Sequence, residues 1–302
     1  MKLMHAVPNF SEGRRQEVIN AILAPLKSIP GVKLISHFPD PDFNRTVVEV
    51  IGQPEPLKEA LLRMTGESIR LIDMREQTGS HPRIGAQDTI PVFPLTGTTV
   101  DECRRLAEEI GAEVFDRYGV PVYFSGENAR TPERRSLDYI RRGQYEGLVK
   151  VAHTPERRPD IGPPALHPTA GAVIVSSGKQ GLVAYNVILD TTDLDLVKPI
   201  AAAVRGPSGG FGSVRSIALR LDKWGGRAAV SMNIFDVAAV PLARVFNLIS
   251  SEAESRGLRV VGSELVGTVP LESIVDAARH FLKMPAFSTS QIIETHVLGG
   301  VD

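Results

Sequence analysis

The sequence predicts a mixed α/β (α+β) fold with two lobes, and three observations lead to this prediction. At 302 residues the chain is long enough to bury a large core, and two compact lobes are expected at this length rather than one. Strand-like and helix-like segments alternate along residues 2–125, and the same theme returns along residues 181–263. The composition, with 42% hydrophobic and 23% charged residues, is ordinary for a soluble globular protein.

The first lobe is expected to have the order β-α-β-β-α-β-α-β, beginning with a short apolar strand at residues 2–7. Asn9 and Ser11, which are both favourable helix N-caps, precede a helix that runs to about Lys27. Apolar and amphipathic patterns then indicate strands at 31–38 and 45–52, a helix from Pro54 or Pro56 to about Ile72, a strand at 88–95, a helix at 98–118 and a strand at 120–125.

The second lobe is expected to have the order β-α-β-β-α-β, which is the split-βαβ, ferredoxin-like arrangement. Its elements are a strand at 181–189, a helix capped by Thr192 or Asp193 that ends at Val204, strands at 213–221 and 228–236, a helix at 241–255 and a strand at 258–263. A last helix at 271–284 is expected as an appendage. Two lobes with related wiring suggest a ligand cleft between them. We predict domains at 1–178 and 181–302, with a boundary near Ser177 to Gly181.

Residues 127–168 differ in composition from the rest of the chain. They are rich in Arg, Pro and Gly, and the one clear helix pattern in them is SLDYIRR. The tract from His153 to Pro168 is especially rich in proline. Long irregular loops in compact domains are usually functional or disordered. We interpret this one as functional because it ends directly in a strand pattern.

Charge and cysteine content argue against several classes of protein. Lys plus Arg is 34 and Asp plus Glu is 35, so bulk electrostatics do not favour binding to nucleic acid or to a membrane. A local positive site for a small anionic ligand remains open. The single cysteine, Cys103, excludes disulfide frameworks and thiolate metal clusters, and its amphipathic helical context predicts a buried core residue.

Targeting segments and common cofactor motifs are not found in the sequence. The opening MKLMHAVPNF lacks the apolar region of a signal peptide, and no run of about 18 apolar residues occurs, so we expect a cytoplasmic protein. GPSGGFGSV (206–214) is rich in glycine, but it follows a predicted helix and precedes a strand, which is the reverse of the Rossmann fingerprint. There is no P-loop, no HExxH and no other close pair of histidine ligands, so no metal is expected.

The stretch TGSHPRIGAQDTIP (78–91) holds the strongest candidate for chemistry. His81 precedes a proline, which biases its backbone to an extended conformation, and Gly79 and Gly85 permit a ligand to approach the main chain closely. An imidazole, with a pKa near 6.5, is the natural proton carrier at neutral pH. Local features alone nevertheless favour a structural loop histidine over a catalytic one. Arg45 and Arg83 could each grip a carboxylate, although a solvent-exposed arginine is the commoner interpretation of either alone.

A series of motifs along the chain resembles one family. VPNFSEGRRQEVI opens the series, and it continues with DPDFNRTVVEV, LIDMREQTGSHPRIGAQDTIPVFPL, DIGPPALHPTAGA, LVAYNVIL, VSMNIFD and GSELVGTVPLES. The series is similar to that of the glutamate formimidoyltransferases (formiminotransferases), which take part in histidine breakdown, and it covers residues 4 to about 282. We expect a stand-alone transferase, without the cyclodeaminase domain that is fused to the animal enzyme.

The resemblance implies transfer of a formimino group from N-formimino-L-glutamate to N5 of tetrahydrofolate, with release of L-glutamate. It implies that His81 is the general acid–base, which takes a proton from N5 and returns one to the departing nitrogen. Asn44, Arg45, Arg83 and Asp88 are assigned to substrate binding, with Asp88 as a carboxylate that orients the loop or the imidazole. The resemblance also implies a homodimer, tetrahydrofolate as co-substrate, and a folate cleft between two α/β lobes.

Two segments are implied to contact folate, because their glycines and prolines would let main-chain groups line the pterin and the glutamyl tail. The first consists of Gly162, Pro163, Pro164, Ala165, Leu166, His167, Pro168, Thr169, Ala170 and Gly171. The second lies within residues 209–217 and contributes Gly209, Gly210 and Arg215.

Two departures from the family pattern bear on specificity. Bacterial relatives often have a histidine where this chain has Phe43, and some carry lysines in the segment that matches Gly212 to Val214, where Arg215 alone offers charge here. Affinity for a long polyglutamyl tail is therefore expected to be lower. Alternative functions remain open. They are formyl transfer from N-formylglutamate, cyclisation of 5-formyltetrahydrofolate, and folate binding without catalysis.

Overall fold

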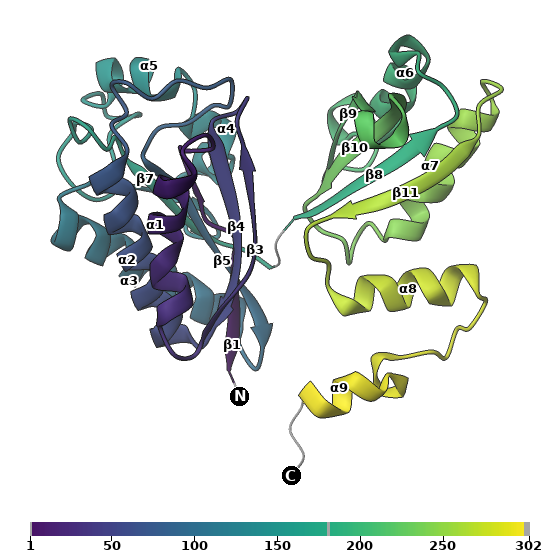
Figure 1. Cartoon of the computed structure of the whole chain (residues 1–302), viewed down its shortest axis with the longest axis horizontal. Helices are drawn as coiled ribbons and strands as arrows, with labels where there is room; N and C mark the ends of the chain where they lie inside the picture. Colours follow the sequence, from purple (N-terminus) through teal and green to yellow (C-terminus); the bar gives the residue numbers. More distant parts are fainter. Residues whose placement is uncertain (1, 180–181, 299–302) are drawn as a thin grey trace. The chain divides into compact units, whose positions relative to one another are not determined.

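The chain forms two compact units, each with its own β-sheet and hydrophobic core (Figure 1). The computed structural model describes residues 2–179 and 182–298. The first unit is Met1–Gly181 and the second is Leu182–Asp302. The domain boundary was predicted near Ser177 to Gly181, and Gly181 lies outside the described residues. The predicted mixed α/β fold is confirmed.

Among the described residues, the sheet of the first unit has seven strands, in the order β1-β4-β2-β5-β7-β6, with β3 paired to β4. β5, β7 and β6 pair in parallel, and the other pairings are antiparallel. β4 begins at Arg45 and β5 contains Asp88, so the sheet itself positions two of the candidate site residues. The strands are β1 (Leu3–Ala6), β2 (Asn9–Phe10), β3 (Val32–Asp40), β4 (Arg45–Gly52), β5 (Gln87–Thr96), β6 (Val122–Gly126) and β7 (Val173–Ser177).

Three long helices cover one face of this sheet (Figure 1). Their apolar side chains and those of the strands form one buried cluster that includes Ile22, Leu61 and Cys103. The core position predicted for Cys103 is confirmed, and burial raises the pKa of its thiol to about 12. The third helix starts at a capping box between Thr99 and Glu102. The helices are α1 (Gln16–Ser28), α2 (Pro54–Leu71) and α3 (Val100–Tyr118).

Two short helices, α4 (Leu137–Ile140) and α5 (Gln144–Val151), pack on the other face near β6. Ile140 and Leu148 form a second buried cluster there with Tyr123. The residues before and after Tyr123 on β6 belong to the first cluster, and because side chains alternate along a strand, the second cluster lies on the opposite face of the sheet. The helix predicted in SLDYIRR is thus a single turn. α5 was not predicted, because a segment of eight residues with an internal glycine shows too little periodicity.

The start of α1 differs from the prediction. Asn9 belongs to β2, and the Ser11 hydroxyl donates to the carbonyl of Gly85 at 2.7 Å, so neither residue caps the helix. Instead, the carboxylate of Glu12 accepts two backbone N–H groups just before α1, at 2.8 and 2.9 Å. The bond from Ser11 to Gly85 joins the N-terminal segment to the loop that carries His81.

The second unit has the order β-α-β-β-α-β followed by two further helices, within the described residues. Its four strands form one antiparallel sheet in the order β11-β8-β10-β9, and α6 and α7 pack on one face of it (Figure 1). Asp193 caps α6, as one of the two predicted choices, by accepting the Asp195 N–H at 2.8 Å. The elements are β8 (Val183–Leu189), α6 (Leu194–Val204), β9 (Val214–Leu221), β10 (Arg227–Ile234), α7 (Leu242–Glu254), β11 (Val260–Val266), α8 (Leu271–Phe281) and α9 (Ile293–Leu298).

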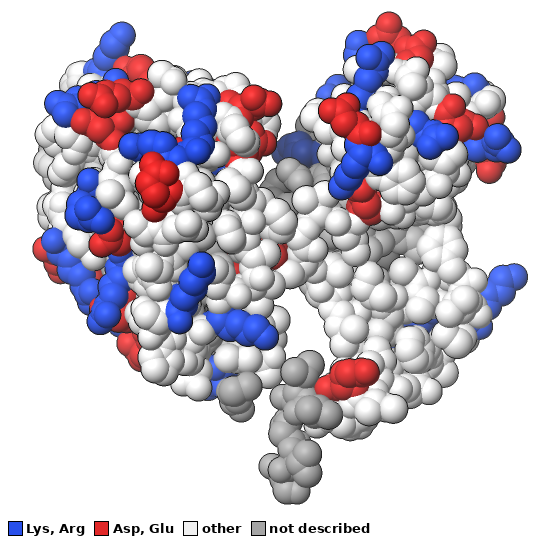
Figure 2. Space-filling view, viewed as in Figure 1, with Lys and Arg blue, Asp and Glu red and all other residues white. Residues whose placement is uncertain are grey.

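The surface carries charges of both signs. Figure 2 shows acidic and basic side chains interspersed over the visible face of the first unit, which fits the formal net charge of −1. Over residues 2–179 and 182–298, no helix is long and apolar enough to cross a membrane. The same residues contain no group of three or more His, Cys, Asp or Glu side chains placed to hold a metal ion.

Candidate active site

His81 lies in the loop between α2 and β5, beside the first residue of β4. Its imidazole is half-buried, and Nη1 of Arg45 lies 2.6 Å from its Nε2. Because a guanidinium in a protein keeps its protons, Arg45 donates this hydrogen bond and Nε2 accepts it. The ring is therefore the neutral tautomer with its proton on Nδ1. That Nδ1 is buried and has no hydrogen-bond partner among the described residues.

A second arginine and a carboxylate surround the imidazole. Asp88 is fully buried on β5, where Oδ1 accepts the Ile84 N–H at 2.7 Å and Oδ2 accepts a hydrogen bond from Nη2 of Arg141. The side chain of Arg141, which follows α4, is 12% exposed, and its buried Nε–H has no partner in the described part of the chain. We call Arg45, His81, Asp88 and Arg141 the imidazole cluster.

Burial and positive charge keep His81 neutral. Burial lowers the pKa of the imidazole to about 4, with further lowering by Arg45 and Arg141, while Asp88 and the Pro82 carbonyl act in the opposite direction. The same environment lowers the pKa of Arg45 to about 10, chiefly through burial and then through Arg141. At neutral pH the imidazole is uncharged, and its one lone pair is occupied by Arg45.

Arg83 bonds to other parts of the protein instead. All five of its N–H groups are used, to the side chain and carbonyl of Gln77 at 2.7 and 2.9 Å, to Gln144 at 2.8 Å, and to both oxygens of Glu146 at 2.7 and 2.9 Å. Its carbonyl also accepts the Tyr145 N–H at 2.9 Å. The expected contact of Arg83 with a substrate carboxylate stays a prediction. The bonds of Arg83 join α5 to the His81 loop.

Asn44 holds the turn before β4 in an uncommon conformation. Its φ is +49°, in the left-handed region that asparagine adopts more readily than most residues. Its Oδ1 accepts the Gly13 N–H at 2.9 Å, its Nδ2 donates to the Thr78 carbonyl at 2.8 Å, and its own carbonyl accepts from Gln77 at 3.0 Å. Asn44 therefore ties three segments together and presents Arg45 to the imidazole.

The glycines beside His81 are needed for contacts within the protein. A Cβ on Gly79 would lie 2.2 Å from the Phe43 carbonyl oxygen, and one on Gly85 would lie 2.0 Å from the Ala172 carbonyl oxygen. The close approach at these glycines is to neighbouring main chain, and the approach of a ligand stays a prediction. The Phe43 side chain is 43% exposed, and its ring centroid lies 5.6 Å from that of His81.

Nearly the whole chain matches the models of one family. Residues 3–178 match the N-terminal subdomain of the formiminotransferase domain, and residues 184–297 match the formiminotransferase domain. The chain belongs to the formiminotransferase family. The resemblance inferred from the motif series is confirmed.

Curated relatives of this chain extend over the same length. Glutamate formimidoyltransferase from Streptococcus pyogenes serotype M1 is 36% identical over 299 residues, which are 99% of each chain. The protein of the same name from Thermoplasma acidophilum is 36% identical over 297 residues, 97% of each chain. Formimidoyltransferase-cyclodeaminase from Sus scrofa is 40% identical over 286 residues, which are 93% of this chain and 52% of that longer protein.

The first predicted folate segment of the formiminotransferase ends against the His81 loop. Gly171 forms an isolated β-bridge with Gly85, and the Ala170 carbonyl accepts the Ala86 N–H at 2.9 Å. Residues 162–165 are exposed, whereas Ala170 and Gly171 are buried. The segment thus leads from the surface to the main chain next to the candidate base.

His167, within this segment, uses one ring nitrogen locally. Its Nδ1 accepts the N–H groups of Thr169 and Ala170 at 3.3 and 3.1 Å. Burial lowers the pKa of the ring, so His167 is neutral at pH 7 and carries its proton on Nε2. This N–H is the donor that the ring can offer to a ligand.

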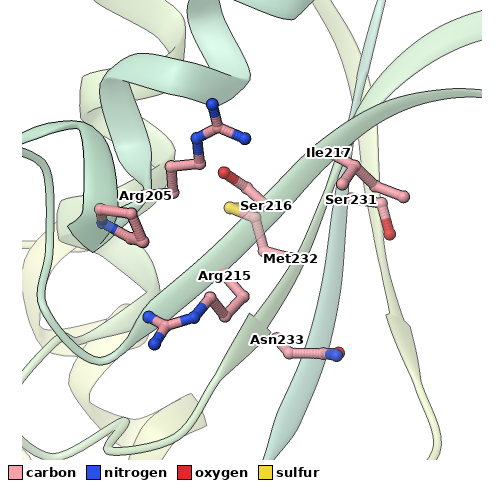
Figure 3. A pocket seen from close by; sticks show the side chains of 8 residues that line it. Arg205, Arg215, Ser216, Ile217, Ser231, Met232 and Asn233 are labelled. Atoms are coloured by element: carbon pink, nitrogen blue, oxygen red, sulfur yellow. The ribbon is translucent and has the colours of Figure 1, made fainter. Parts of the chain in front are cut away.

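The second predicted folate segment belongs to the second unit. Gly209 has φ +95°, and a Cβ on Gly210 would lie 2.3 Å from the Val204 carbonyl oxygen, so both glycines shape the connection from α6 to β9. Arg215 and Arg205 border one pocket of about 340 Å³ beside β9, which gives it a positive charge that suits an anionic ligand (Figure 3). The pocket is also lined by Pro207, Ser216, Ile217, Ser231, Met232 and Asn233.

Sequence reasoning missed Arg141, for which the local signal is weak. It is one of two adjacent arginines in SLDYIRR, within the segment interpreted as functional. Its neighbour Arg142 is exposed and lies with its guanidinium carbon 5.5 Å from the centroid of the Tyr139 ring. The two differ in their tertiary partners, because Arg141 alone reaches Asp88.

Proposed function

We propose that this chain is a glutamate formimidoyltransferase, which moves the formimino group from N-formimino-L-glutamate to N5 of tetrahydrofolate and releases L-glutamate. Similarity over nearly the full length to two proteins of this name supports the proposal. The structural observation that carries it is the half-buried, neutral imidazole of His81, held at Nε2 by Arg45. A neutral imidazole is the form that can accept a proton.

The transfer requires one group that both accepts and donates a proton. Tetrahydrofolate supplies the nucleophilic N5, and formiminoglutamate supplies an amidine carbon. A bond forms between N5 and this carbon, and the bond from the carbon to the glutamate nitrogen breaks. His81 accepts the proton that N5 loses and donates it to the departing nitrogen. Such help is worth about 10²–10⁴ in rate, and the proximity of two bound substrates supplies much of the remaining acceleration.

Among the residues expected to bind substrate, Arg45 is still proposed to do so. Its guanidinium bonds to the His81 imidazole and not to a carboxylate of the protein, so it can pair with a substrate carboxylate. Asn44 and Arg83 are proposed to position the loops around His81, because their polar groups are bonded to protein. Asp88 is proposed to orient the His81 loop through the Ile84 N–H.

We also propose that each of the two units, which we assign as domains 1–178 and 181–302, contributes residues that contact folate. Exposed residues 162–165 lead to the His81 loop in one unit, and the other unit has the pocket beside Arg205 and Arg215. The sheet order β11-β8-β10-β9 supports ferredoxin-like wiring in the second unit, and we extend this wiring to the first, with added strands. A cytoplasmic homodimer is the assembly that we propose from the family.

The proposal is tested by assaying purified protein with tetrahydrofolate and formiminoglutamate. N-formylglutamate as donor and 5-formyltetrahydrofolate as sole substrate are assayed in parallel. Formiminoglutamate is expected to be the preferred donor. His81→Asn is expected to lower kcat by about 10²–10⁴ while folate binding is retained. Wild-type turnover by His81→Asn would refute the mechanism, and folate binding without turnover of any donor would identify a binding protein.

A further inference from the structure

The imidazole cluster holds its base in a blocked form. A general base must present its lone pair to the proton that it removes. The lone pair on Nε2 of His81 is bonded to Arg45 at 2.6 Å. Arg45 must therefore leave Nε2 before this nitrogen can act. Its protons then need another acceptor, because a half-buried guanidinium that loses its partner has limited access to water.

Among the described residues, the carboxylates that act on Arg45 are those of Asp88 and Asp40, and both already accept hydrogen bonds. Asp88 uses one oxygen for the Ile84 N–H and the other for Arg141. Asp40, at the end of β3, uses Oδ1 to accept two backbone N–H groups of the following turn, at 3.0 and 2.8 Å. An acceptor that draws Arg45 away from the imidazole is thus expected to come from a ligand.

Arg141 supplies a second unsatisfied donor in the same cluster. Its charge acts on both His81 and Arg45, which shows that it lies near both. Its Nη2 is bonded to Asp88, but its buried Nε–H has no partner in the described ranges. A buried donor without a protein partner is rare in folded proteins, and the Arg141 Nε–H can be satisfied by an acceptor atom of a ligand. Within the imidazole cluster two guanidinium groups accompany one carboxylate, and this excess of positive charge suits an anion.

We propose that a carboxylate of the formimino donor binds to Arg141 and Arg45 together and draws Arg45 away from Nε2 of His81, so that the base is exposed only when the donor is bound. Arg45 gains from this exchange, because a hydrogen bond between two charged groups is roughly twice as strong as one between neutral groups. The identity of the donor rests on the proposed function, whereas binding of a carboxylate to the cluster does not.

The bound carboxylate also changes the electrostatics of the imidazole. Arg45 and Arg141 both disfavour the charged ring in the free protein, and Asp88 offsets them only in part. An added negative charge would oppose both guanidinium groups and raise the pKa of His81. The ring then becomes a stronger base at the moment when the substrate is in place.

The test follows the His81 ring by NMR in protein with isotope-labelled histidine, with His81→Asn to assign its signal. The midpoint of its pH titration is measured in the free protein and with saturating L-glutamate, which carries both carboxylates of the donor, with and without tetrahydrofolate. L-glutamate is expected to raise the midpoint by about one pH unit or more. An unchanged midpoint under saturating L-glutamate would overturn the inference.

Variants at two adjacent arginines make the test specific. Arg141→Gln is expected to abolish the shift and to weaken L-glutamate binding at least about tenfold. Arg142→Gln, the exposed neighbour, is the matched control and should behave as wild type. Arg141→Lys keeps the charge beside Asp88 but lacks the planar fork, so it should fold and show a reduced shift. A full shift in both Arg141 variants would contradict the proposal.

Two analogues distinguish the carboxylates of the ligand. L-glutamine lacks the side-chain carboxylate, and L-isoglutamine lacks the α-carboxylate. If L-glutamine does not shift the His81 titration, the side-chain carboxylate is the group that binds the cluster. If L-isoglutamine does not shift it, the α-carboxylate is that group. None of these readouts requires turnover. A shift in a protein without transferase activity would therefore support this inference and refute the proposed function, and turnover without a shift would do the reverse.

Discussion

Arg45 and Arg83 lie in neighbouring motifs around the same histidine, yet their surroundings are opposite. Arg83 has all five N–H groups bonded to Gln77, Gln144 and Glu146, whereas Arg45 bonds to the nitrogen that the proposed mechanism needs. The first arrangement is typical of an arginine that stabilises a fold, and the second agrees with the ligand-binding role proposed for Arg45. The partners of an arginine, more than its distance from a catalytic residue in sequence, decide which role it can take.

The sharpest test of this contrast is Arg45→Gln. We expect kcat/KM for formiminoglutamate to fall about ten- to a hundredfold, mainly through KM, because charge-assisted hydrogen bonds to a carboxylate are lost. The free energy of unfolding should change by less than about 1 kcal/mol, since the Arg45 guanidinium is held by an imidazole and not by a buried ion pair. Steady-state kinetics and urea denaturation measure the two quantities. An unchanged KM would remove Arg45 from the binding site.

Arg83→Gln should show the opposite pattern. It leaves acceptors of Gln77 without their donor, and we expect a loss of about 1–2 kcal/mol in the free energy of unfolding, because the Glu146 side chain is 59% exposed and water screens its pairing with Arg83. KM for formiminoglutamate should stay close to wild type at temperatures where the variant is folded. Arg134→Gln is a matched control, because Arg134 is equally buried and pairs with Asp160 at 2.6 Å. A large rise in KM for the folded Arg83 variant, absent from the control, would mean that Arg83 touches substrate.

The regular elements are largely predictable from sequence because their signals are local. Alternating β-branched residues predict β4 at its observed bounds, 45–52, and the proline-started pattern after it predicts α2. Asn9 and Ser11 show the limit of such signals. Both have the chemistry of helix caps, but a sheet pairing takes one and a bond to the Gly85 carbonyl takes the other.

The candidate site is predictable in part for a related reason. The motif series identifies His81 and Arg45, which the structure brings to within 2.6 Å of each other. The same series cannot separate Arg45 from Arg83, because the difference lies in tertiary partners. The role of Arg141 is harder to predict, because its contact with Asp88 spans 53 positions in sequence and its own segment has no regular hydrophobic pattern.

Burial, together with the charges of Arg45 and Arg141, lowers the pKa of His81, and this should make the free energy of unfolding depend on pH. The pKa of His81 is lowered from 6.5 to about 4, so the unfolded chain binds more protons between these values. The contribution is fully present above about pH 6.5 and is lost as pH falls towards 4. Urea denaturation at a series of pH values between 7 and 4.5 should therefore show that the free energy of unfolding falls more steeply with decreasing pH in wild type than in His81→Asn. His153→Asn, at an exposed histidine of the same unit, should follow wild type. Equal slopes in all three would argue against a depressed pKa.

The smallest effect on activity is expected from substitution of Phe43, whose ring centroid lies 5.6 Å from that of His81. Phe43→His introduces a group that gains charge below about pH 6.5, next to a cluster that already holds two guanidinium groups. Turnover should match wild type near pH 8 and fall below it in more acidic solution. Phe43→Leu, which adds no charge, should keep a constant ratio to wild type across the same range. Because Phe43 is 43% exposed, water screens the added charge, so the loss should be well below that of Arg45→Gln. A ratio for Phe43→His that does not vary with pH would show that charge on this side of the ring does not reach the base.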